Sequence, residues 1–511
     1  ATPTFQSQWP QGQAILEERG FHFQAQGRWV PHGVMTATLV QQVLVRLEVP
    51  AQTAIRLATA VGGHHGLFPR ADERNQTGPL VLGRAEWDTA RDRLLDAVMN
   101  ACGIVGRSAP QAGGTGENSV DILLAGLTSV ADWIASDARR FPFSSVELDV
   151  TAYVARAQVQ ARAALEEQGW LHWGDVSQPM SFRQLFEFEP RPLQEVTVEL
   201  AEWLPSPALV IVEAPMGEGK TEAAMYLADR AGLSGGQQGA YFALPTEATS
   251  NQMFLRVKSF LEHRYGESLV NLQLLHGHAS LSAEFALLQR NAGALLTPQG
   301  VALDERRKPS NVMAAEWFTH RKRGLLATYG VGTVDQALLA VLQTKHFFVR
   351  LFGLAHKTVV LDEVHAYDDY MEGLLERLVS WLSALGSTVI LLSATLPRER
   401  RRKLIDAFQQ GTGRAAETIT QDTPYPRVTW CTAEASGSLS FSVADQSRRR
   451  LRVTWVDGRL PVAADAPFPL GERLREALAG GGCAAVVCNT VDTAQRVYSQ
   501  LKRYFSAEEL D

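Results

Sequence analysis

The sequence predicts an all-α domain, then an α/β domain built on a doubly wound parallel sheet, then the start of a second sheet domain. Residues 1 to about 165 repeat apolar side chains at helical spacing. Between about 182 and 421, strand-like apolar runs alternate with amphipathic segments, as in a parallel sheet with crossover helices. Two more apolar runs, 451–456 and 483–488, are expected as strands after Thr423-Pro-Tyr-Pro426. We therefore expect domains at 1–170, 171–425 and 426–511.

Five main helices are expected in the first domain, at 34–47, 51–61, 87–99, 121–135 and 150–167. Its stretch 103–119 is rich in Gly and Ser and is expected to be a mobile loop. Residues 169–181 are expected to be a linker to the sheet domain.

The composition fits a large multi-domain enzyme of 511 residues with a net charge of -6 and a pI near 6.1. Contacts to nucleic acid would therefore come from local basic faces. The runs 398–403 and 448–452 are candidates, although a charge run is usually a solvated face. We find no apolar run of membrane-spanning length and no signal-peptide pattern, so a cytoplasmic location without a membrane partner is expected.

The cysteines lack metal-ligand spacing and are expected to be reduced and mostly buried. They are Cys102, Cys431, Cys483 and Cys488.

A phosphate-binding loop is predicted in Glu213-Ala-Pro-Met-Gly-Glu-Gly-Lys-Thr221. An apolar run, 208–212, precedes it and a helical pattern, 221–231, follows it, which is the strand-loop-helix order that such a loop requires. Lys220 would reach the β- and γ-phosphates, and the Thr221 hydroxyl would ligate Mg²⁺. The alternative is a glycine-rich turn that only caps a helix. The predicted ATP-binding residues of the loop are Ala214, which replaces a glycine of the general pattern, Gly217, Glu218, Gly219, Lys220 and Thr221.

An acidic pair follows the buried-strand pattern 357–361, which would bring Asp362 and Glu363 to the carboxyl edge of the sheet beside this loop. Asp362 suits the Mg²⁺ sphere, and Glu363 suits orientation or deprotonation of the attacking water. On its own, such a pair is commonly a solvated turn. His365 is a candidate catalytic residue, although a lone histidine is more often structural.

A third strand pattern, 387–392, leads into Ser393, Ala394 and Thr395. The short hydroxyl side chains of Ser393 and Thr395 could bond both the acidic pair and a neighbouring domain, and the three residues are therefore predicted to couple the motor parts. With the phosphate loop and the acidic pair in this order, the chain resembles superfamily 2 helicases.

The helical domain carries three histidines and an aspartate: His32, the pair His64-His65, and Asp132. Imidazoles and a carboxylate that converge between helices make a site for a divalent metal, which could activate water for attack on a phosphodiester. A structural role is the alternative for His32 taken alone.

The chain resembles the CRISPR-associated helicase-nuclease of type I interference systems. The motifs that carry this resemblance are His64-His65-Gly, Leu127-Thr-Ser-Val-Ala-Asp-Trp133, Pro245-Thr-Glu-Ala-Thr-Ser-Asn-Gln252, Gly332-Thr-Val-Asp-Gln336 and Asp362-Glu-Val-His-Ala-Tyr-Asp368. The resemblance implies an HD-type nuclease domain fused to a DEVH-box helicase with two RecA-like domains. It also implies a role in antiviral defence, degrading DNA that a crRNA-guided surveillance complex (Cascade) recruits.

The resemblance further implies ATP and Mg²⁺ as cofactors and the displaced single DNA strand as a partner, with 3'-to-5' translocation. His32, His64, His65 and Asp132 would bind a transition metal such as Fe, Mn, Co or Ni. Gln194 would read adenine, since an amide can pair with its edge. The implied DNA-binding residues are Thr246, Ser250, Asn251, Gln252 and Thr333.

Both ends of the chain depart from this resemblance. The opening, 1–6, resembles the stretch just after the family's His-Asp signature, and Asn489-Thr490 resembles the first motif of the second helicase lobe. We expect a central piece with an incomplete metal site and an incomplete ATPase. Two other functions stay open: a superfamily 2 helicase or RNA remodeller with a purely structural helical domain, and an ATP-gated scaffold that binds nucleic acid without turnover.

Overall fold

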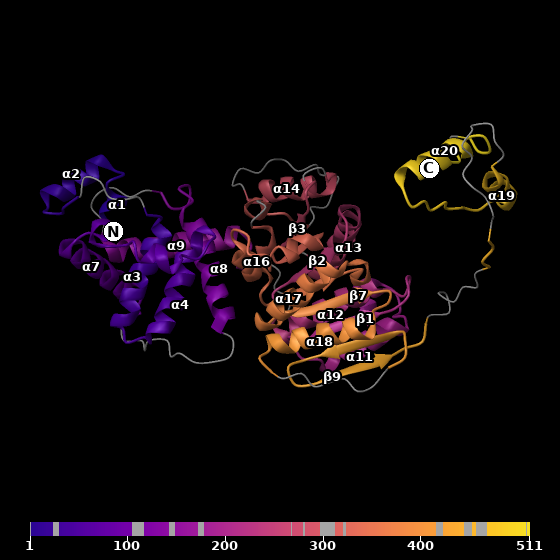
Figure 1. Ribbon diagram of the computed structural model, residues 1–511, viewed down its shortest axis with the longest axis horizontal. Coiled ribbons are helices and arrows are strands. Elements are labelled where there is room, and N and C mark those ends of the chain that lie inside the picture. Colours follow the sequence, from indigo (N-terminus) through magenta and orange to yellow (C-terminus); the bar gives the residue numbers. More distant parts are fainter. Residues whose placement is uncertain are drawn as a thin grey trace. The chain divides into compact units, whose positions relative to one another are not determined.

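The computed structural model divides into two compact units, Ala1–Ser447 and Arg448–Asp511, and each is treated by itself (Figure 1). The structure describes residues 2–23, 30–104, 117–142, 149–171, 178–266, 268–279, 282–296, 312–319, 323–414, 423–443, 452–455, 468–506 and 508–510.

The first part of the larger unit is helical, as predicted. Its elements are α1 (Pro3–Gln6), α2 (Pro10–Glu18), α3 (His32–Arg46), α4 (Ala51–Gly62), η1 (Gly63–His65), α5 (Ala71–Arg74), α6 (Pro79–Leu82), α7 (Ala85–Ala101), α8 (Glu117–Ala135) and α9 (Val150–Glu167). The five expected helices correspond to α3, α4, α7, α8 and α9. Most of the expected loop at 103–119 and the middle of the expected linker at 169–181 lie outside the described residues.

A nine-stranded sheet in the order β4-β3-β5-β2-β6-β7-β1-β8-β9 forms the rest of this unit. The seven strands β1 to β7 pair in parallel, and β8 and β9 are antiparallel additions at one edge. The strands are β1 (Leu209–Glu213), β2 (Ala240–Leu244), β3 (Val270–Leu275), β4 (Val312–Met313), β5 (Tyr329–Thr333), β6 (Thr358–Leu361), β7 (Thr388–Ser393), β8 (Arg427–Cys431) and β9 (Ser436–Ser440).

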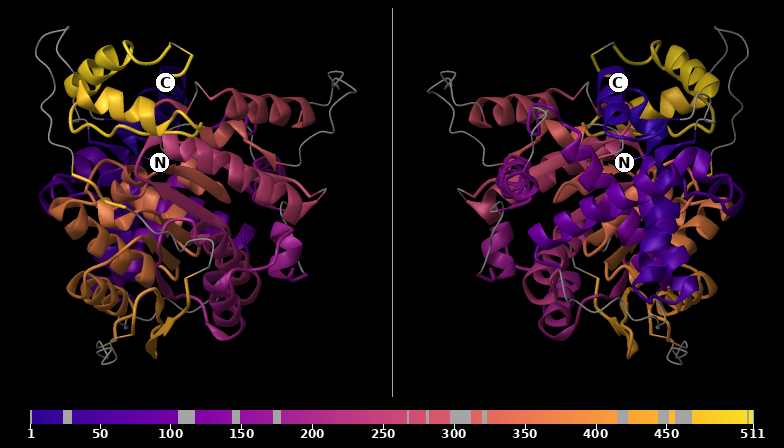
Figure 2. Two further views of the ribbon diagram at one scale, coloured as in Figure 1. Left: turned by 90° about the vertical axis from the view of Figure 1, so that its right-hand side faces the viewer. Right: turned by 90° about the vertical axis from the view of Figure 1, so that its left-hand side faces the viewer.

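Helices cover both faces of this sheet, so the doubly wound prediction is confirmed (Figure 2). Side chains alternate along β1: Leu209 and Ile211 enter one core, and Val210 and Val212 enter the other. The elements that connect and cover the strands are α10 (Phe182–Phe186), α11 (Pro192–Trp203), α12 (Lys220–Gly235), α13 (Glu247–Tyr265), α14 (Ala283–Leu296), η3 (Glu316–Thr319), η4 (Gly324–Leu326), α15 (Val334–Leu338), α16 (Phe347–Leu354), η5 (Val364–Ala366), α17 (Asp369–Ala384) and α18 (Arg398–Gly411).

The helical part packs on the sheet part through α8 and α16. A Cβ atom at Gly126 of α8 would lie 2.3 Å from the Cβ atom of Phe352 of α16, so only glycine permits this approach. Ile122 and Ala125 of α8 belong to the same apolar core as Phe348 of α16. The two parts therefore share one core within residues 1–447.

The position of β8 corrects the boundary that we expected at residue 425. β8 pairs antiparallel with β1, and β9 pairs with β8, so both belong to the first sheet. The division between the compact units falls after Ser447. The Pro-rich signal therefore marks the turn into β8, which extends the first sheet beyond β1 and pairs in turn with the edge strand β9.

The unit Arg448–Asp511 contains α19 (Pro469–Ala477) and α20 (Val491–Leu501), which pack through Phe468, Val497 and Leu501. The two strands expected here are wrong for the residues that the structure describes: 452–455 and 483–488 are not extended in a sheet. A strand is stabilised by hydrogen bonds to a neighbour. These runs have no such neighbour among the described residues, and Val487 is 94% exposed.

All four cysteines are free, as predicted, but only Cys431 is buried; Cys102 and Cys483 are exposed, which corrects the expectation of mostly buried thiols. Among the described residues, no helix is both long and apolar enough to cross a membrane.

Lys357, just before β6, is buried and donates hydrogen bonds to the carbonyls of Leu325 and Ala327. Burial lowers the pKa of its amine from 10.5 to about 7. Between these two values the unfolded chain binds a proton that the folded chain does not, so stability should rise with pH by up to about 1.4 kcal/mol per unit. We expect Lys357→Met to remove this slope in urea unfolding between pH 7 and 10. The exposed control Lys403→Met should retain it, and equal slopes in the two variants would refute the assignment.

Candidate nucleotide, nucleic-acid and metal sites

The sheet order separates the predicted site residues into two groups along one edge. The loops after β1, β6 and β7, which are neighbours in the sheet, carry the predicted ATP and coupling residues. The predicted DNA-binding residues lie after β2 and at the end of β5, which are also neighbours, and β3 is the next strand beyond β5. Because the seven strands are parallel, all these loops lie at their carboxyl ends, where α/β sheets bind ligands.

The predicted phosphate loop has the expected local structure, with β1 before it and α12 after it. Gly217 and Gly219 have φ angles of 86° and 81°, in the region that favours glycine. The Lys220 ammonium donates to the carbonyls of Ala214 (2.8 Å) and Pro215 (3.1 Å), so it lies within the curve of the loop. Burial lowers the pKa of Lys220, and the nearby carboxylates, Glu363 first, oppose that shift.

The acidic pair after β6 faces this lysine. Burial raises the pKa of Asp362, and the neighbouring charge of Glu363 raises it further. The Asp362 carboxylate accepts a hydrogen bond from the backbone N–H of Glu363 (2.9 Å), whose φ is 53°. A half-buried carboxylate beside a like charge is an environment that a bound cation would stabilise.

His365 joins this acidic pair to the segment after β7. Its Nδ1 lies 3.3 Å from the Glu363 carboxylate and 3.4 Å from both the Ser393 hydroxyl and the Ala394 backbone nitrogen. The Ser393 hydroxyl also donates to the carbonyl of Thr395 (2.7 Å). These contacts connect the segment 393–395 to Glu363 through His365, and the role of this segment in coupling stays a prediction.

A cavity of about 520 Å³ lies beside the phosphate loop and the acidic pair, and its volume is within the range of small-molecule sites. Its lining combines cations with the acidic pair, a set suited to a polyphosphate with a divalent cation. Lining residues that the sequence analysis missed are Phe188, Arg191, Met216, Glu222 and Arg256. The predicted residues that line the cavity are Gln194, Gly217, Gly219, Lys220, Thr221, Asp362 and Glu363. Two other predicted residues of the loop, Ala214 and Glu218, do not line the cavity.

Gln194 lines the cavity, but its amide already has backbone partners. Its oxygen accepts from the N–H of Arg191 (2.9 Å), and its nitrogen donates to the carbonyl of Gly219 (3.2 Å). Only 1% of the residue is exposed. In this arrangement Gln194 fixes the phosphate loop against α11, and adenine recognition by it stays a prediction.

Glu213, the last residue of β1, is buried between two arginines. Its carboxylate accepts from Arg401 of α18 (2.8 Å) and from two nitrogens of Arg427 of β8 (2.9 and 3.1 Å). These ion pairs connect β1, the strand before the phosphate loop, to α18 and to β8. Arg401 and Arg400, which pairs with Glu372, thus have structural partners, whereas the other cations of the basic run 398–403 are exposed: Arg398, Arg402 and Lys403.

We expect Glu213→Gln to lower the free energy of unfolding of the 1–447 unit by about 3–5 kcal/mol, because it leaves two buried guanidiniums without their carboxylate. Urea titration followed by tryptophan fluorescence measures this. Glu434→Gln is a matched control, since Glu434 is exposed and its ion pair is with an exposed residue, Arg414. A loss below 1 kcal/mol in both variants would contradict the prediction.

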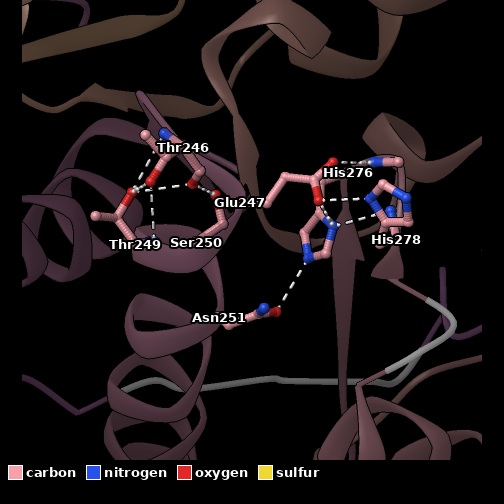
Figure 3. A network of polar contacts seen from close by, with 8 residues as sticks. Thr246, Glu247, Thr249, Ser250, Asn251, His276 and His278 are labelled. Carbon is pink, nitrogen blue, oxygen red and sulfur yellow. Dashed lines mark hydrogen bonds and ion pairs between the residues drawn. The ribbon is translucent and has the colours of Figure 1, made fainter. Parts of the chain in front are cut away.

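The predicted DNA-binding residues lie around the start of α13 (Figure 3). Thr246 caps this helix, and its hydroxyl accepts from the N–H of Thr249 (3.2 Å). Ser250 is buried and donates to the carbonyl of Thr246 (2.8 Å), so it supports the cap and offers little surface to a strand. Gln252 is exposed, and Thr333 is paired in register with Leu244, the last residue of β2.

Two histidines after β3, which the sequence analysis missed, complete this network. Glu247 accepts from the backbone N–H of Gly277 (3.1 Å) and lies 2.8 Å from Nδ1 of His278 (Figure 3). Nε2 of His276 is 3.0 Å from the amide oxygen of Asn251. The available signal was the His-Gly-His sequence directly after an apolar run.

Three predicted metal ligands converge in the helical part. The ends of α3 and α4 cross closely: a Cβ at Gly33 would lie 2.5 Å from the carbonyl of Gly62. This crossing brings Nε2 of His32 within 2.9 Å of Nε2 of His64 and 2.5 Å of Nε2 of His65. The three candidate ligand atoms all lie within 4.8 Å of one another.

The surroundings of the cluster suit metal binding. Nδ1 of His64 is 2.8 Å from the carbonyl of Val61; donation there leaves the Nε2 lone pair facing the other histidines, which is the usual arrangement of a metal-binding imidazole. Burial and the neighbouring imidazoles lower the pKa values of His32 and His65, favouring the neutral form that ligates metals. Three nitrogen donors facing one space fit a divalent transition metal.

Asp132 lies near this cluster but is not one of the group within 4.8 Å. Its charge opposes the lowering of the pKa values of His32 and His65. Ser129, one helical turn earlier on α8, donates to the carbonyl of His64 (3.0 Å), so Asp132 is on the same helix face as a direct contact of the cluster. Its role as a fourth ligand stays a prediction.

Comparison with known proteins adds independent findings. A family model described as "Cas3, HD domain" matches residues 1–141, which include the histidine cluster and Asp132. The CRISPR-associated endonuclease/helicase Cas3 of Thermus thermophilus is 40% identical over 514 residues, covering 98% of this chain and 52% of that protein. The chain spans about half the length of the curated relatives it matches.

Solved structures resemble the fold as well. The crystal structure of T. fusca Cas3 with ADP matches with a TM-score of 0.76 and 33% identity, covering 94% of this chain and 54% of that one. A chain in a structure described as a CRISPR RNA-guided surveillance complex, pre-nicking, matches with a TM-score of 0.65 and 30% identity, covering 96% of this chain and 52% of that one.

Proposed function

This chain belongs to the Cas3 family of CRISPR-associated nuclease-helicases, and on that premise we propose that it supplies the nuclease domain and the first motor lobe of an ATP-driven enzyme that degrades DNA in type I interference. The supporting observation is the pairing, in one compact unit, of a nucleotide-sized cavity with a separate three-histidine cluster.

The residues of the cavity have distinct tasks in this proposal. Lys220 and the N–H groups at the start of α12 bind the phosphates, because both present positive charge to the loop. Asp362 and the Thr221 hydroxyl would hold Mg²⁺, which would neutralise phosphate charge. Glu363 orients the attacking water, and its contact with His365 transmits the state of the cavity to Ser393 and Ala394.

His32, His64 and His65, with Asp132 near them, would hold the nuclease metal. A divalent transition metal there would supply a water of lowered pKa for phosphodiester attack. The Val61 carbonyl fixes the His64 ring, and Ser129 fixes the backbone that carries it. The motor would pull the displaced single strand across the loops after β2, β5 and β3 and deliver it to this cluster.

The surveillance complex is the proposed source of that strand, since a chain similar to this one occurs in a structure described by that name. We expect the full protein to bind the complex after target recognition and to act in the cytoplasm.

Two assays on the full protein test the proposal. Cleavage of circular single-stranded DNA is measured with EDTA and with added Mn²⁺, Fe²⁺, Co²⁺ or Ni²⁺, and phosphate release from ATP is measured with and without single-stranded DNA. We expect metal-dependent cleavage and DNA-stimulated hydrolysis. Hydrolysis without cleavage under every metal would favour the helicase with a structural helical domain. DNA binding without hydrolysis would favour the ATP-gated scaffold.

A further inference from the structure

We propose that Arg256 of α13 is the residue through which nucleotide binding is transmitted to the DNA-contacting loops. The proposal rests on the proposed function and assigns a positioning role within it. Arg256 lines the nucleotide cavity, and two residues near the start of the same helix, Glu247 and Asn251, belong to the polar network of Figure 3.

Arg256 contacts a group that the bound nucleotide needs. Its guanidinium donates to the Thr221 hydroxyl (3.3 Å) and forms an ion pair with Glu222. Thr221 is the proposed Mg²⁺ ligand, so Arg256 places a positive charge where Mg²⁺ would also place one. Two cations at one hydroxyl repel each other, and the Mg²⁺-nucleotide state therefore requires the guanidinium to leave Thr221.

The departing guanidinium has a suitable new partner. Arg256 lines the cavity together with Lys220, where the phosphates would bind. A planar guanidinium pairs with phosphate oxygens through two parallel hydrogen bonds. Arg256 thus has two arrangements, one on Thr221 and Glu222 and one on the phosphates, and the nucleotide selects between them.

The geometry of α13 connects this change to the DNA side. Glu247 and Arg256 are nine residues apart, which is about two and a half turns or ~13 Å and places them on opposite faces. The buried side chains of Met253, Phe254 and Val257 pack the helix on the sheet, so it moves as one body.

The DNA-facing end of α13 holds the loop after β3. Glu247 contacts His278 and the backbone of Gly277, and Asn251 contacts His276. A shift of α13 therefore moves the Thr246 cap and this histidine loop together, and both lie among the proposed contacts to the strand. Glu247 and Asn251 thus connect the start of α13 to the loop after β3.

The test measures how the binding of one ligand changes the affinity for the other, using the full protein. Affinity for fluorescein-labelled oligo(dT) is measured by anisotropy with and without Mg²⁺-AMPPNP, and AMPPNP affinity is measured with and without oligo(dT). In the wild type each ligand should change the affinity of the other by the same factor, within the ~5- to 150-fold range common for coupled sites. Arg256→Ala should bring this factor to within about twofold of one, and Arg256→Lys should retain only part of it.

Lys258→Ala is the matched control, because Lys258 is a cation on the same helix that pairs with Glu262 and does not line the cavity. Its coupling factor should equal that of the wild type. If Arg256→Ala binds both ligands and keeps the full factor, Arg256 is only a structural ion pair and the inference is overturned. If the wild type itself binds neither AMPPNP nor oligo(dT), the proposed function fails, and that result is distinct from failure of the Arg256 assignment.

Discussion

Replacing Lys220 by alanine is expected to abolish ATP-dependent unwinding by the full protein while leaving ATP-independent nicking of single-stranded DNA unchanged. The ammonium lies inside the phosphate loop, bonded to the carbonyls of Ala214 and Pro215, where it would meet the phosphates. Its loss removes a charge that acts on the transferring phosphoryl group in a partly buried site, a type of contact worth orders of magnitude in rate. The histidine cluster is built on α3 and η1, apart from this loop.

Two measurements on the same preparation check this result. A fork-shaped DNA reports unwinding with ATP, and a circular single strand reports nicking with metal and without ATP. Lys258→Ala, which removes a lysine that does not line the cavity, should behave as the wild type in both. Equal loss of both activities in Lys220→Ala would show that the two sites are not separable.

The sequence was sufficient to predict the parts of the fold that depend on local periodicity. The strands β1, β6 and β7 are continuous apolar runs, and each leads into a motif whose residue types restrict its chemistry: Lys220, Asp362, Ser393. Helix α3, the turn η1 and helix α8 bring His32, His64 and Asp132 near one another, although nothing in the spacing of 32, 64 and 132 predicts it. Their convergence was expected from the family resemblance and the donor types together.

What could not be predicted depends on contacts distant in sequence. Arg256 is an ordinary exposed arginine in the middle of a helix, and only the placement of α13 on the sheet brings it to Thr221. The pairing of Glu213 with Arg401 and Arg427 requires the register of β8 against β1. The runs 452–455 and 483–488 were predicted as strands from their composition but are not strands in the structure. A β-rich run becomes a strand only beside a partner, and that partner is not specified by the run itself.

Asp132→Ala is expected to eliminate DNA cleavage by the full protein while sparing DNA-stimulated ATP hydrolysis. Asp132 supplies the carboxylate near the three imidazoles, and its charge favours a cation among them. Without it the cluster offers nitrogen donors alone, so metal affinity should fall by the roughly 10- to 100-fold typical of lost supporting groups, or further if Asp132 ligates the metal directly. Metal content after dialysis distinguishes this from a purely kinetic effect.

The matched control is Asp121→Asn, on the same helix, where Asp121 pairs with Arg56. It should lose some stability and keep both activities and the bound metal. A double readout on Asp132→Ala, cleavage of circular single-stranded DNA beside phosphate release, then decides the role of the residue. Retained cleavage with normal metal content would make Asp132 a helix-packing residue. Loss of hydrolysis as well would mean that α8, through its packing on Phe352 of α16, supports the motor rather than the nuclease.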